Sequence, residues 1–382
     1  MIGKLITWSL SRRGLVAAAG LALLIAGTLY VRSMPVDAIP DLSDVQVIIY
    51  TDYPGQAPQV VENQVTYPLV TALLGVPKVK VVRGQSMFST SFVYVIFAEG
   101  TDLYWARSRV LERLSAVQSR LPAGAKTELG PDATGVGWVY QYAVEGDGYS
   151  PAQLRSVQDF QLRYALQGVP GVAEVASIGG FVRQYQVLLD PVRLQSYGVT
   201  AQQITEAVRG ANQDVGARTV EVAGSDYAIR GLGYFRGAED IAKVTVAVGD
   251  GGRPVRVGDV ADVTLGADLR VGIAELNGKG EAVGGVVVMR IGANALEVVS
   301  GVKARLAELA PSLPPGVHIV TTYDRTGLIQ HSLETLRRTL LEESLIVALV
   351  CAVFLLHLRS ALVAIVTLPL GVLQLLRNAP GA

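Results

Sequence analysis

Residues 14–31 read GLVAAAGLALLIAGTLYV, eighteen consecutive residues without a charge, flanked by arginines at positions 12, 13 and 32. An α-helix rises about 1.5 Å per residue, so this stretch comes close to spanning the roughly 30 Å of hydrocarbon in a bilayer. A cleaved secretory signal is the competing interpretation, but its apolar core would span about 7 to 15 residues and end at an Ala-x-Ala site. The chain continues VRSMPVDAIPD instead. We therefore expect a retained membrane helix, with a cytoplasmic start because basic residues are more frequent before it than after it.

A second apolar region lies far along the chain, from Leu340 to Leu358, and a third begins at Ala361. Arg359 follows the second region and is expected in the cytoplasm, which agrees with the topology of the first helix. The 33 basic and 33 acidic residues balance, so charge gives no indication of a nucleic-acid partner. The single cysteine, Cys351, excludes a disulfide within one chain. About 300 residues between the apolar regions are thus expected outside the membrane.

The first part of this exported stretch alternates between strand and helix patterns. Apolar and β-branched runs predict strands, and apolar residues spaced three and four apart predict helices. The expected elements are a strand at Val45–Tyr50, a helix at Ala57–Leu74, strands at Lys78–Arg83 and Ser89–Phe97, a helix capped by Asp102 and stopped by Pro122, and a strand near Lys126. This order is the split βαβ pattern of a ferredoxin-like domain.

The pattern then recurs, because GVPGVAEV at 168–175 echoes GVPKVKV at 75–81 at an offset of 93 residues. The elements expected for the second set are a strand at Val139–Glu145, a helix at Pro151–Leu166, a strand at Val283–Arg290, a helix at Leu296–Leu309 and a strand at Val317–Thr322. Residues from about Val182 to Gly272 interrupt this set. They have strand and helix patterns of their own, so we expect an inserted subdomain rather than a loop.

Five segments carry a resemblance to a known family. They are PVDAIPDLSDVQV at 35–47, YPGQAP at 53–58, GTDLYWAR at 100–107, GPDATGVGW at 130–138 and TTYDR at 321–325. In these segments, and nearly unbroken to about Gly371, the chain resembles the heavy-metal branch of the resistance-nodulation-division efflux pumps, in particular the CusA-type copper/silver exporters.

The resemblance implies an α+β membrane protein, in which transmembrane helices accompany a periplasmic region of two ferredoxin-like βαββαβ porter subdomains with an inserted docking subdomain. The implied boundaries are 1–33 for a cytoplasmic start and first membrane helix, 34–134 for the first porter subdomain, 135–181 and 273–326 for the second, 182–272 for the docking subdomain, 327–359 for a linker helix and second membrane helix, and 360–382 for a truncated, atypical third helix. Family members are much longer, and the tail after Gly371 departs from their pattern. We therefore expect an N-terminal fragment, inactive alone.

The implied function is proton-driven export of a heavy metal, Cu(I) or Ag(I), by a secondary transporter of the bacterial inner membrane with most of its chain in the periplasm. The implied partners are two further copies in a homotrimer, a periplasmic adaptor and an outer-membrane channel. No cofactor, nucleic acid or enzymatic reaction is expected. Two alternatives remain open: export of a divalent cation such as zinc, cobalt or cadmium, and a membrane-anchored interaction module without transport activity.

Few residues stand out as carriers of this chemistry. Thioether sulfur suits Cu(I), which makes Met87 a candidate for the metal path beside the simpler interpretation of packing or loop exposure. Glu342 and Glu343 are candidates for a proton relay, beside a role at a helix start near the membrane interface. The residues of the family motif, to which we assign a structural role, are Pro35, Asp37, Pro40, Asp41, Tyr53, Pro54 and Gly55. Asp37, Asp41 and Asp44 would either attract cations or form turns.

Overall fold

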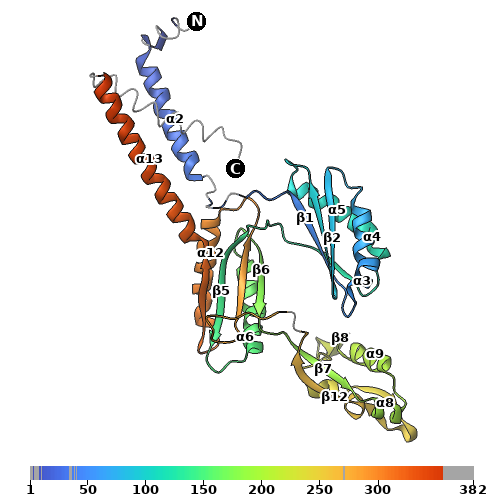
Figure 1. Cartoon of the computed structure of the whole chain (residues 1–382). Coiled ribbons are helices and arrows are strands. Elements are labelled where there is room, and N and C mark those ends of the chain that lie inside the picture. The colour runs from blue at the N-terminus through green and yellow to red at the C-terminus, as the bar shows by residue number, and fades with distance from the viewer. Residues whose placement is uncertain are drawn as a thin grey trace. The chain divides into compact units, whose positions relative to one another are not determined.

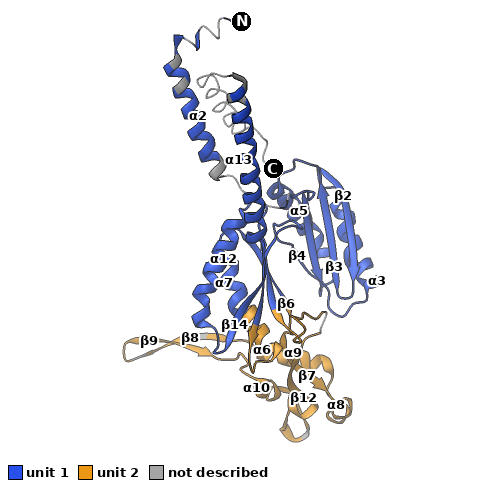
Figure 2. Ribbon diagram, turned by 60° about the vertical axis from the view of Figure 1, so that its left-hand side comes forward, with its two compact units in different colours: residues 1–144, 160–177, 284–382 blue, residues 145–159, 178–283 orange. Residues whose placement is uncertain are grey.

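The computed structural model describes residue 3, residues 8–9, 11–33, 37, 39, 41–269 and 272–355. Figure 1 follows these residues from the N-terminus in blue to helix α13 in red. The chain divides into two compact units, which Figure 2 colours separately. Unit 1 comprises residues 1–144, 160–177 and 284–382, and unit 2 comprises residues 145–159 and 178–283.

A four-stranded sheet forms the first folded part of unit 1. Its strands lie in the order β2-β3-β1-β4, which is the order of a ferredoxin-like sheet. The elements are β1 (Gln46–Asp52), α3 (Pro58–Val61), η1 (Glu62–Thr66), α4 (Tyr67–Leu73), β2 (Val79–Met87), β3 (Thr90–Phe97), α5 (Leu103–Val117), η2 (Gln118–Arg120) and β4 (Lys126–Leu129). Ile49, Val93 and Val95 on the sheet and Val61, Val65 and Val110 on the helices are fully buried in one core. Every element predicted for this sheet is present.

A second sheet repeats this topology with a different exit. Its order is β14-β5-β13-β6, so the first strand of the set again lies between the third and the fourth. The elements are β5 (Trp138–Gly146), α6 (Pro151–Val157), η3 (Gln158–Leu162), α7 (Arg163–Gln167), β6 (Val172–Gly179), β13 (Val283–Met289), α12 (Ala295–Leu309), η5 (Ala310–Ser312) and β14 (Val317–Asp324). The predicted strands and helices of the second set are therefore confirmed, including β13 and β14 beyond the long insertion.

Both sheets share two details that periodicity alone does not predict. The helical stretch after the first strand contains one π turn in each case, at η1 and at η3, where a regular helix was expected. The residue before the second strand of each set is left-handed: Lys78 has φ 64° and Gly171, 93 positions later, has φ 82°. The internal repeat is thus visible in the backbone as well as in the sequence.

Unit 2 contains two-stranded sheets and short helices around a small apolar core. Val199, Ile204, Val255, Val257, Val260 and Ala261 are buried there. The elements are β7 (Arg183–Leu189), α8 (Pro191–Tyr197), α9 (Ala201–Ala211), β8 (Val215–Val222), β9 (Ser225–Gly231), α10 (Ala238–Ala242), β10 (Thr245–Val248), η4 (Asp250–Gly252), β11 (Pro254–Arg256), α11 (Val257–Val260) and β12 (Ala261–Ala267). Strands β7 and β12 pair antiparallel, as do β10 with β11 and β8 with β9. The prediction that residues 182–272 fold on their own elements is confirmed.

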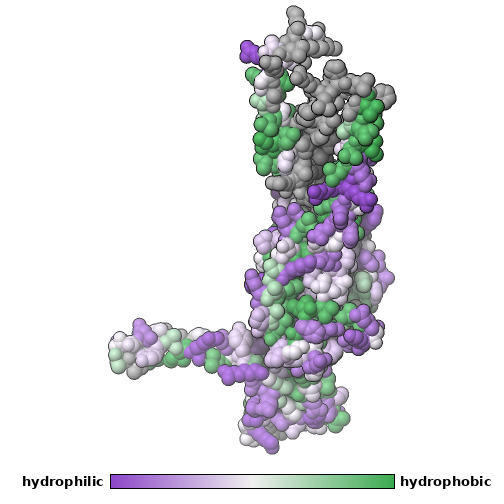
Figure 3. All heavy atoms as spheres, turned by 90° about the vertical axis from the view of Figure 1, so that its left-hand side faces the viewer, coloured by the Kyte–Doolittle hydropathy of each residue, from purple (hydrophilic) through white to green (hydrophobic). Residues whose placement is uncertain are grey.

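Two long helices, α2 (Arg13–Ser33) and α13 (Arg325–Leu355), complete the described chain. Apolar side chains gather on both (Figure 3); exposed ones include Leu21, Ile25 and Leu29 of α2 and Leu345, Ile346 and Leu349 of α13. Within the part of the chain that the structure describes, neither of them nor any other helix combines the length and the apolar character needed to cross a membrane. The predicted third apolar segment, from Ala361, lies outside the described residues.

Candidate functional site

The connector between α2 and β1 forms local turns through its aspartates. A carboxylate oxygen of Asp37 accepts the backbone N–H of Ile39 at 3.3 Å, and one of Asp41 accepts that of Ser43 at 3.0 Å. Hydrogen bonds of this kind, two residues along the chain, are typical of Asx turns. The turn-forming interpretation of Asp37 and Asp41 is therefore confirmed by geometry, whereas Pro35 and Pro40 lie outside the described residues.

Arg325, the first residue of α13, lies beside this connector with only 1% of its surface exposed. Its Nε is 2.9 Å from Oδ1 of Asp37, and its Nη1 donates to the main-chain oxygen of Val136. The approach to Asp37 brings opposite charges together without the alignment of a directed hydrogen bond, and Nη2 also has no hydrogen-bond partner among the described residues. A buried guanidinium thus joins two segments that are far apart in sequence.

Residues Gly130–Gly137, which we call the inter-sheet linker, receive contacts from every neighbouring element. On the side of the first sheet, Nη1 of Arg107 donates to the oxygen of Gly130 at 2.8 Å, and the hydroxyl of Tyr104 donates to Oδ2 of Asp132 at 2.9 Å. On the side of the second sheet, the N–H of Ile291 donates to the oxygen of Asp132 at 3.0 Å. The linker is therefore held between the two sheets by side-chain and main-chain hydrogen bonds.

Electrostatics at this junction favour ionised aspartates. Partial burial raises the pKa of Asp41, but hydrogen bonds with Thr134 and Ser43 and the charge of Arg325 outweigh it, so the pKa is lowered. Burial likewise raises the pKa of Asp324, and the ion pair with Lys303 and the hydrogen bonds of Thr326 lower it further than burial raises it. The pKa of the Tyr104 hydroxyl is raised, mainly because it donates to Asp132. At neutral pH the junction thus carries fixed charges.

The second part of the family motif forms a turn that is tied to the hairpin between β2 and β3. Tyr53 donates its backbone N–H to the oxygen of Ser89 at 2.7 Å, and Gly55, with φ 77°, donates its own to the hydroxyl of Ser89 at 2.9 Å. Met87 is the last residue of β2, pairs with Thr90 and is 43% exposed. It lies on a strand end rather than between strands, and among the described residues no cluster of His, Cys, Asp or Glu could hold a metal ion.

The expectation that Glu342 and Glu343 lie at a helix start is wrong. Helix α13 begins at Arg325, where a carboxylate oxygen of Asp324 accepts the N–H of Thr326 at 2.9 Å as an N-cap. No proline follows within its 31 residues, so the helix runs on through both glutamates. Oε1 of Glu342 accepts from Nε of Arg338 at 2.8 Å, an exposed pair one turn apart.

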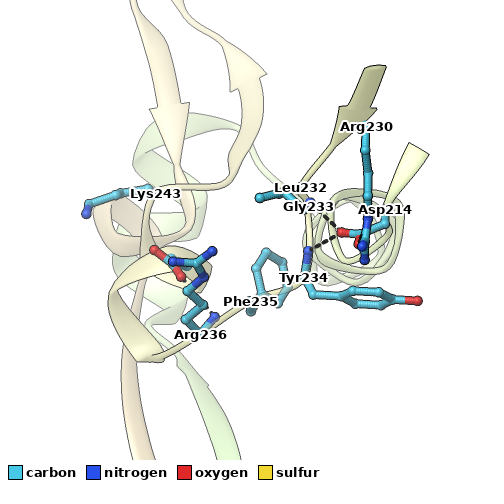
Figure 4. Close-up of a pocket in the computed structure, with 9 residues that line it drawn as sticks. Asp214, Arg230, Leu232, Gly233, Tyr234, Phe235, Arg236 and Lys243 are labelled. Atoms are coloured by element: carbon cyan, nitrogen blue, oxygen red, sulfur yellow. Dashed lines mark hydrogen bonds and ion pairs between the residues drawn. The ribbon is translucent and has the colours of Figure 1, made fainter. Parts of the chain in front are cut away.

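Unit 2 contains a polar cavity of about 590 Å³ at the base of the β8–β9 hairpin, shown in Figure 4. One oxygen of Asp214 accepts the N–H groups of Gly233 and Tyr234, and its other oxygen pairs with Arg230. The bond from Gly233, followed by the pairing with Arg230, lowers the pKa of Asp214. The two ends of the hairpin are thereby fixed to one carboxylate, whereas both faces of β9 are exposed.

Sequence reasoning missed the residues that make these contacts. Arg325, Thr134, Asp132 and Tyr104 all lie within segments that carry the family resemblance, but the sequence assigns them no partner. A single polar residue beside an apolar strand is too common a signal to identify a junction. Their spacing becomes informative only when the second sheet is known to close with β14.

Comparisons with known proteins agree with this architecture. The chain is 54% identical over 373 residues to the cation efflux system protein CusA of Escherichia coli (strain K12) and 53% identical to the putative cation efflux system protein SilA of Salmonella typhimurium. These alignments cover 97% of the chain and 36% of each relative. It is 37% identical over 382 residues to the cobalt-zinc-cadmium resistance protein CzcA of Cupriavidus metallidurans, covering 98% of the chain and 36% of that relative.

A crystal structure of a heavy metal efflux pump superposes with a TM-score of 0.86 at 31% identity, covering 97% of this chain and 37% of that one. The chain thus spans little more than a third of the length of the proteins that it matches. The sequence profile of the AcrB/AcrD/AcrF family matches residues 5–376. With this match, the porter fold and the five motif segments, the chain belongs to the AcrB/AcrD/AcrF family and is of the CusA type within it.

Proposed function

We propose that this chain is the N-terminal part of a proton-driven heavy-metal efflux transporter and that it does not transport by itself. The observation that carries the proposal is the 54% identity with CusA across 97% of the chain, combined with two sheets of porter topology. The chain corresponds to 36% of that relative, and transport requires residues that the resemblance places in the remainder. The nearest analogue of its role is therefore a porter module that works with the rest of a pump.

The proposed cargo is Cu(I) or Ag(I), with a proton as counter-ion. Identity with CusA and SilA is 53–54%, against 37% with the cobalt-zinc-cadmium resistance protein CzcA. Soft monovalent ions favour thioether ligands, and Met87 is an exposed thioether at the edge of the first sheet. We assign Met87 to the metal path as a transient contact rather than a binding site. Glu342 and Glu343 stay proposed relay residues; Glu342 would have to leave Arg338 to act.

The proposed location is the inner membrane, with both sheets and unit 2 in the periplasm. The charge-free sequence from Gly14 to Val31 and the exposed leucines of α13 support insertion of α2 and of the second half of α13. The proposed subdomains are the first porter at 34–134, the second porter at 135–181 and 273–326, and a docking subdomain at 182–272. The separate apolar core of unit 2 supports the last of these.

The proposed assembly is a homotrimer that binds a periplasmic adaptor and an outer-membrane channel. Its support in this chain is the β8–β9 hairpin, which extends from unit 2 in Figure 2. Val215, Val220, Tyr227 and Ile229 are exposed along it. A lone two-stranded hairpin is marginally stable in water, so one with exposed apolar side chains on it fits a surface that another chain covers. The same hairpin favours the second candidate function, a membrane-anchored interaction module.

Survival of a pump-deleted bacterium on graded copper, silver, zinc and cobalt tests the proposal. The 382-residue chain, the same chain with an empty partner plasmid, and the chain supplied with the remainder of a CusA-type pump are compared. We expect resistance to copper and silver only in the last strain. Resistance from the chain alone would refute its inactivity, and protection against zinc or cobalt would support the divalent alternative. Co-purification of the chain with full-length subunits without any resistance would instead support the interaction module.

A further inference from the structure

The inter-sheet linker, Gly130–Gly137, is in contact with four parts of unit 1. The first sheet holds it through Arg107 and Tyr104, and the N–H of Gly130 donates to the oxygen of Ile48 in β1 at 2.8 Å. The second sheet holds it through the N–H groups of Ile291 and of Met289, the latter donating to Gly137 at 2.8 Å. The linker is therefore the segment through which both sheets are joined by directed hydrogen bonds.

The other two contacts come from outside the sheets. Thr134 hydrogen bonds to Asp41 of the connector that follows α2, and the oxygen of Val136 accepts from Arg325 at the start of α13. Arg325 also pairs with Asp37 of the same connector. Because α2 leads into the connector and α13 begins at Arg325, both long helices end on this one linker.

Arg325 is held in an arrangement that stability alone does not explain. A guanidinium has five N–H donors, and burial without partners for them is unfavourable. Among the described residues, Arg325 is 99% buried by surface, yet Nε and Nη2 have no hydrogen-bond partner while Nη1 donates to Val136. Unsatisfied buried donors of this kind tend to occur where function rather than stability selects the residue.

We propose that the inter-sheet linker is a joint that transmits movement of α13 to the two sheets, and that Arg325 is its positioning residue. A rotation of α13 displaces Nη1 and so pulls on Val136, and the linker passes the displacement to Asp132 and to Tyr104 of α5. The inference rests on the proposed transport function for its biological meaning. Its structural content, a mechanical connection from α13 to the linker, stands independently of any metal.

Spin-label distances in the 382-residue chain, reconstituted in lipid nanodiscs with Cys351→Ala, test the joint. Ala133→Cys on the linker and Ser332→Cys on α13 carry the labels. We expect a narrow distance distribution for the parent and about a twofold broader one for Arg325→Gln, because the side chain then loses its charge and its fork of donors. Arg325→Lys retains the charge opposite Asp37 and should recover part of the width. Arg338→Gln, which breaks an exposed ion pair on the same helix, is the matched control and should leave the distribution unchanged.

A second label pair keeps the test decisive if Arg325→Gln does not fold. Tyr104→Phe removes one hydroxyl from an exposed side chain, and labels at Ala133→Cys and Ser108→Cys report on the linker relative to α5. We expect this distance to broaden in Tyr104→Phe while the distance from the linker to α13 stays narrow. An unchanged linker-to-α5 distance in Tyr104→Phe, or equal broadening by Arg325→Gln and Arg338→Gln, would overturn the proposal. A chain without any transport role would still give the expected distances, so failure of the proposed function remains distinguishable.

Discussion

The two sheets of unit 1 have the same topology, yet they solve one local problem with different residues. At the left-handed position before the second strand, the first sheet has Lys78 and the second has Gly171. The ammonium of Lys78 lies 4.8 Å from the ring centre of Trp105, a cation–π contact with α5. A Cβ at Gly171 would lie 2.6 Å from Cγ2 of Val298 on α12. The helix that faces the position therefore determines whether a side chain fits there.

The sheets also differ at their exits, and this difference separates structure from coupling. The first sheet ends at β4 and continues into the inter-sheet linker, whereas the second ends at β14 and continues directly into α13. The second exit is fixed by Asp324, which caps α13 and pairs with Lys303 of α12. One copy of the repeat thus leads to its sister, and the other leads to a long helix.

The largest expected effect is at the left-handed position of the second sheet. Gly171→Ala adds a Cβ at φ 82° against Val298, so we expect a loss of about 2–4 kcal/mol from backbone strain and overpacking. Lys78→Gly relieves strain but gives up the contact with Trp105, so its cost should stay within about 1 kcal/mol. Urea unfolding of both variants measures the contrast. Equal losses at the two positions would show that Val298 does not determine the difference.

The next effect concerns the π turn of the first sheet. A Cβ at Gly84 would lie 2.5 Å from Cγ2 of Thr66, whose hydroxyl is fixed by Ser86 at 2.8 Å and Ser91 at 2.7 Å. Because this hydroxyl network prevents Thr66 from moving aside, Gly84→Ala should cost about 1–3 kcal/mol. Gly216→Ala in β8 is the control, since a Cβ there meets no atom within 4 Å. A neutral Gly84→Ala would mean that the π turn yields at no cost.

These details indicate how far the sequence could be read. Apolar periodicity and the 93-residue echo predicted both sheets, because each buries one face whose pattern is local. The same reasoning predicted turns at Asp37 and Asp41, which depend on neighbours two residues away. The π turns have no comparable pattern, and the β8–β9 hairpin lacks alternation because all of β9 is exposed. Helix α13 was placed too late, since Gly327 suggested a beginning that Asp324 had already capped.

The junction could not be predicted for a different reason. Arg325 and Val136 are 189 positions apart, and their contact exists only because β14 and β5 lie side by side in the second sheet. Sequence similarity identified both segments as family motifs but gave no account of why they occur together. The structure supplies that account in one buried guanidinium. Residues that join elements, rather than build them, are visible only after the fold is known.

A smaller effect separates the caps of the equivalent helices α5 and α12. The carboxylate of Asp102 accepts one short bond from the N–H of Trp105 at 2.7 Å, whereas the amide of Asn294 accepts from Leu296 and Glu297 at 3.0 and 3.4 Å. Each substitution to alanine should cost about 0.5–2 kcal/mol. Asp102→Ala should cost more, because a negative charge also suits a helix N-terminus by about 0.3–1 kcal/mol. Thermal unfolding in low and high salt checks this, since only the loss at Asp102 should shrink with salt.

The smallest effect is a change in acid stability at the exit of the second sheet. The pKa of Asp324 is lowered in the folded chain from an ordinary value of 3.8, so its ionised form stabilises the fold above about pH 4. That contribution is lost as pH falls through the lowered pKa, because folding then requires a carboxylate that the unfolded chain has already protonated. Asp324→Asn should therefore flatten the dependence of stability on pH between about 4 and 2. Glu342→Gln, an exposed partner of Arg338 farther along α13, should leave it unchanged. A parent-like slope in Asp324→Asn would mean that the pair with Lys303 does not hold the exit of β14 to α12.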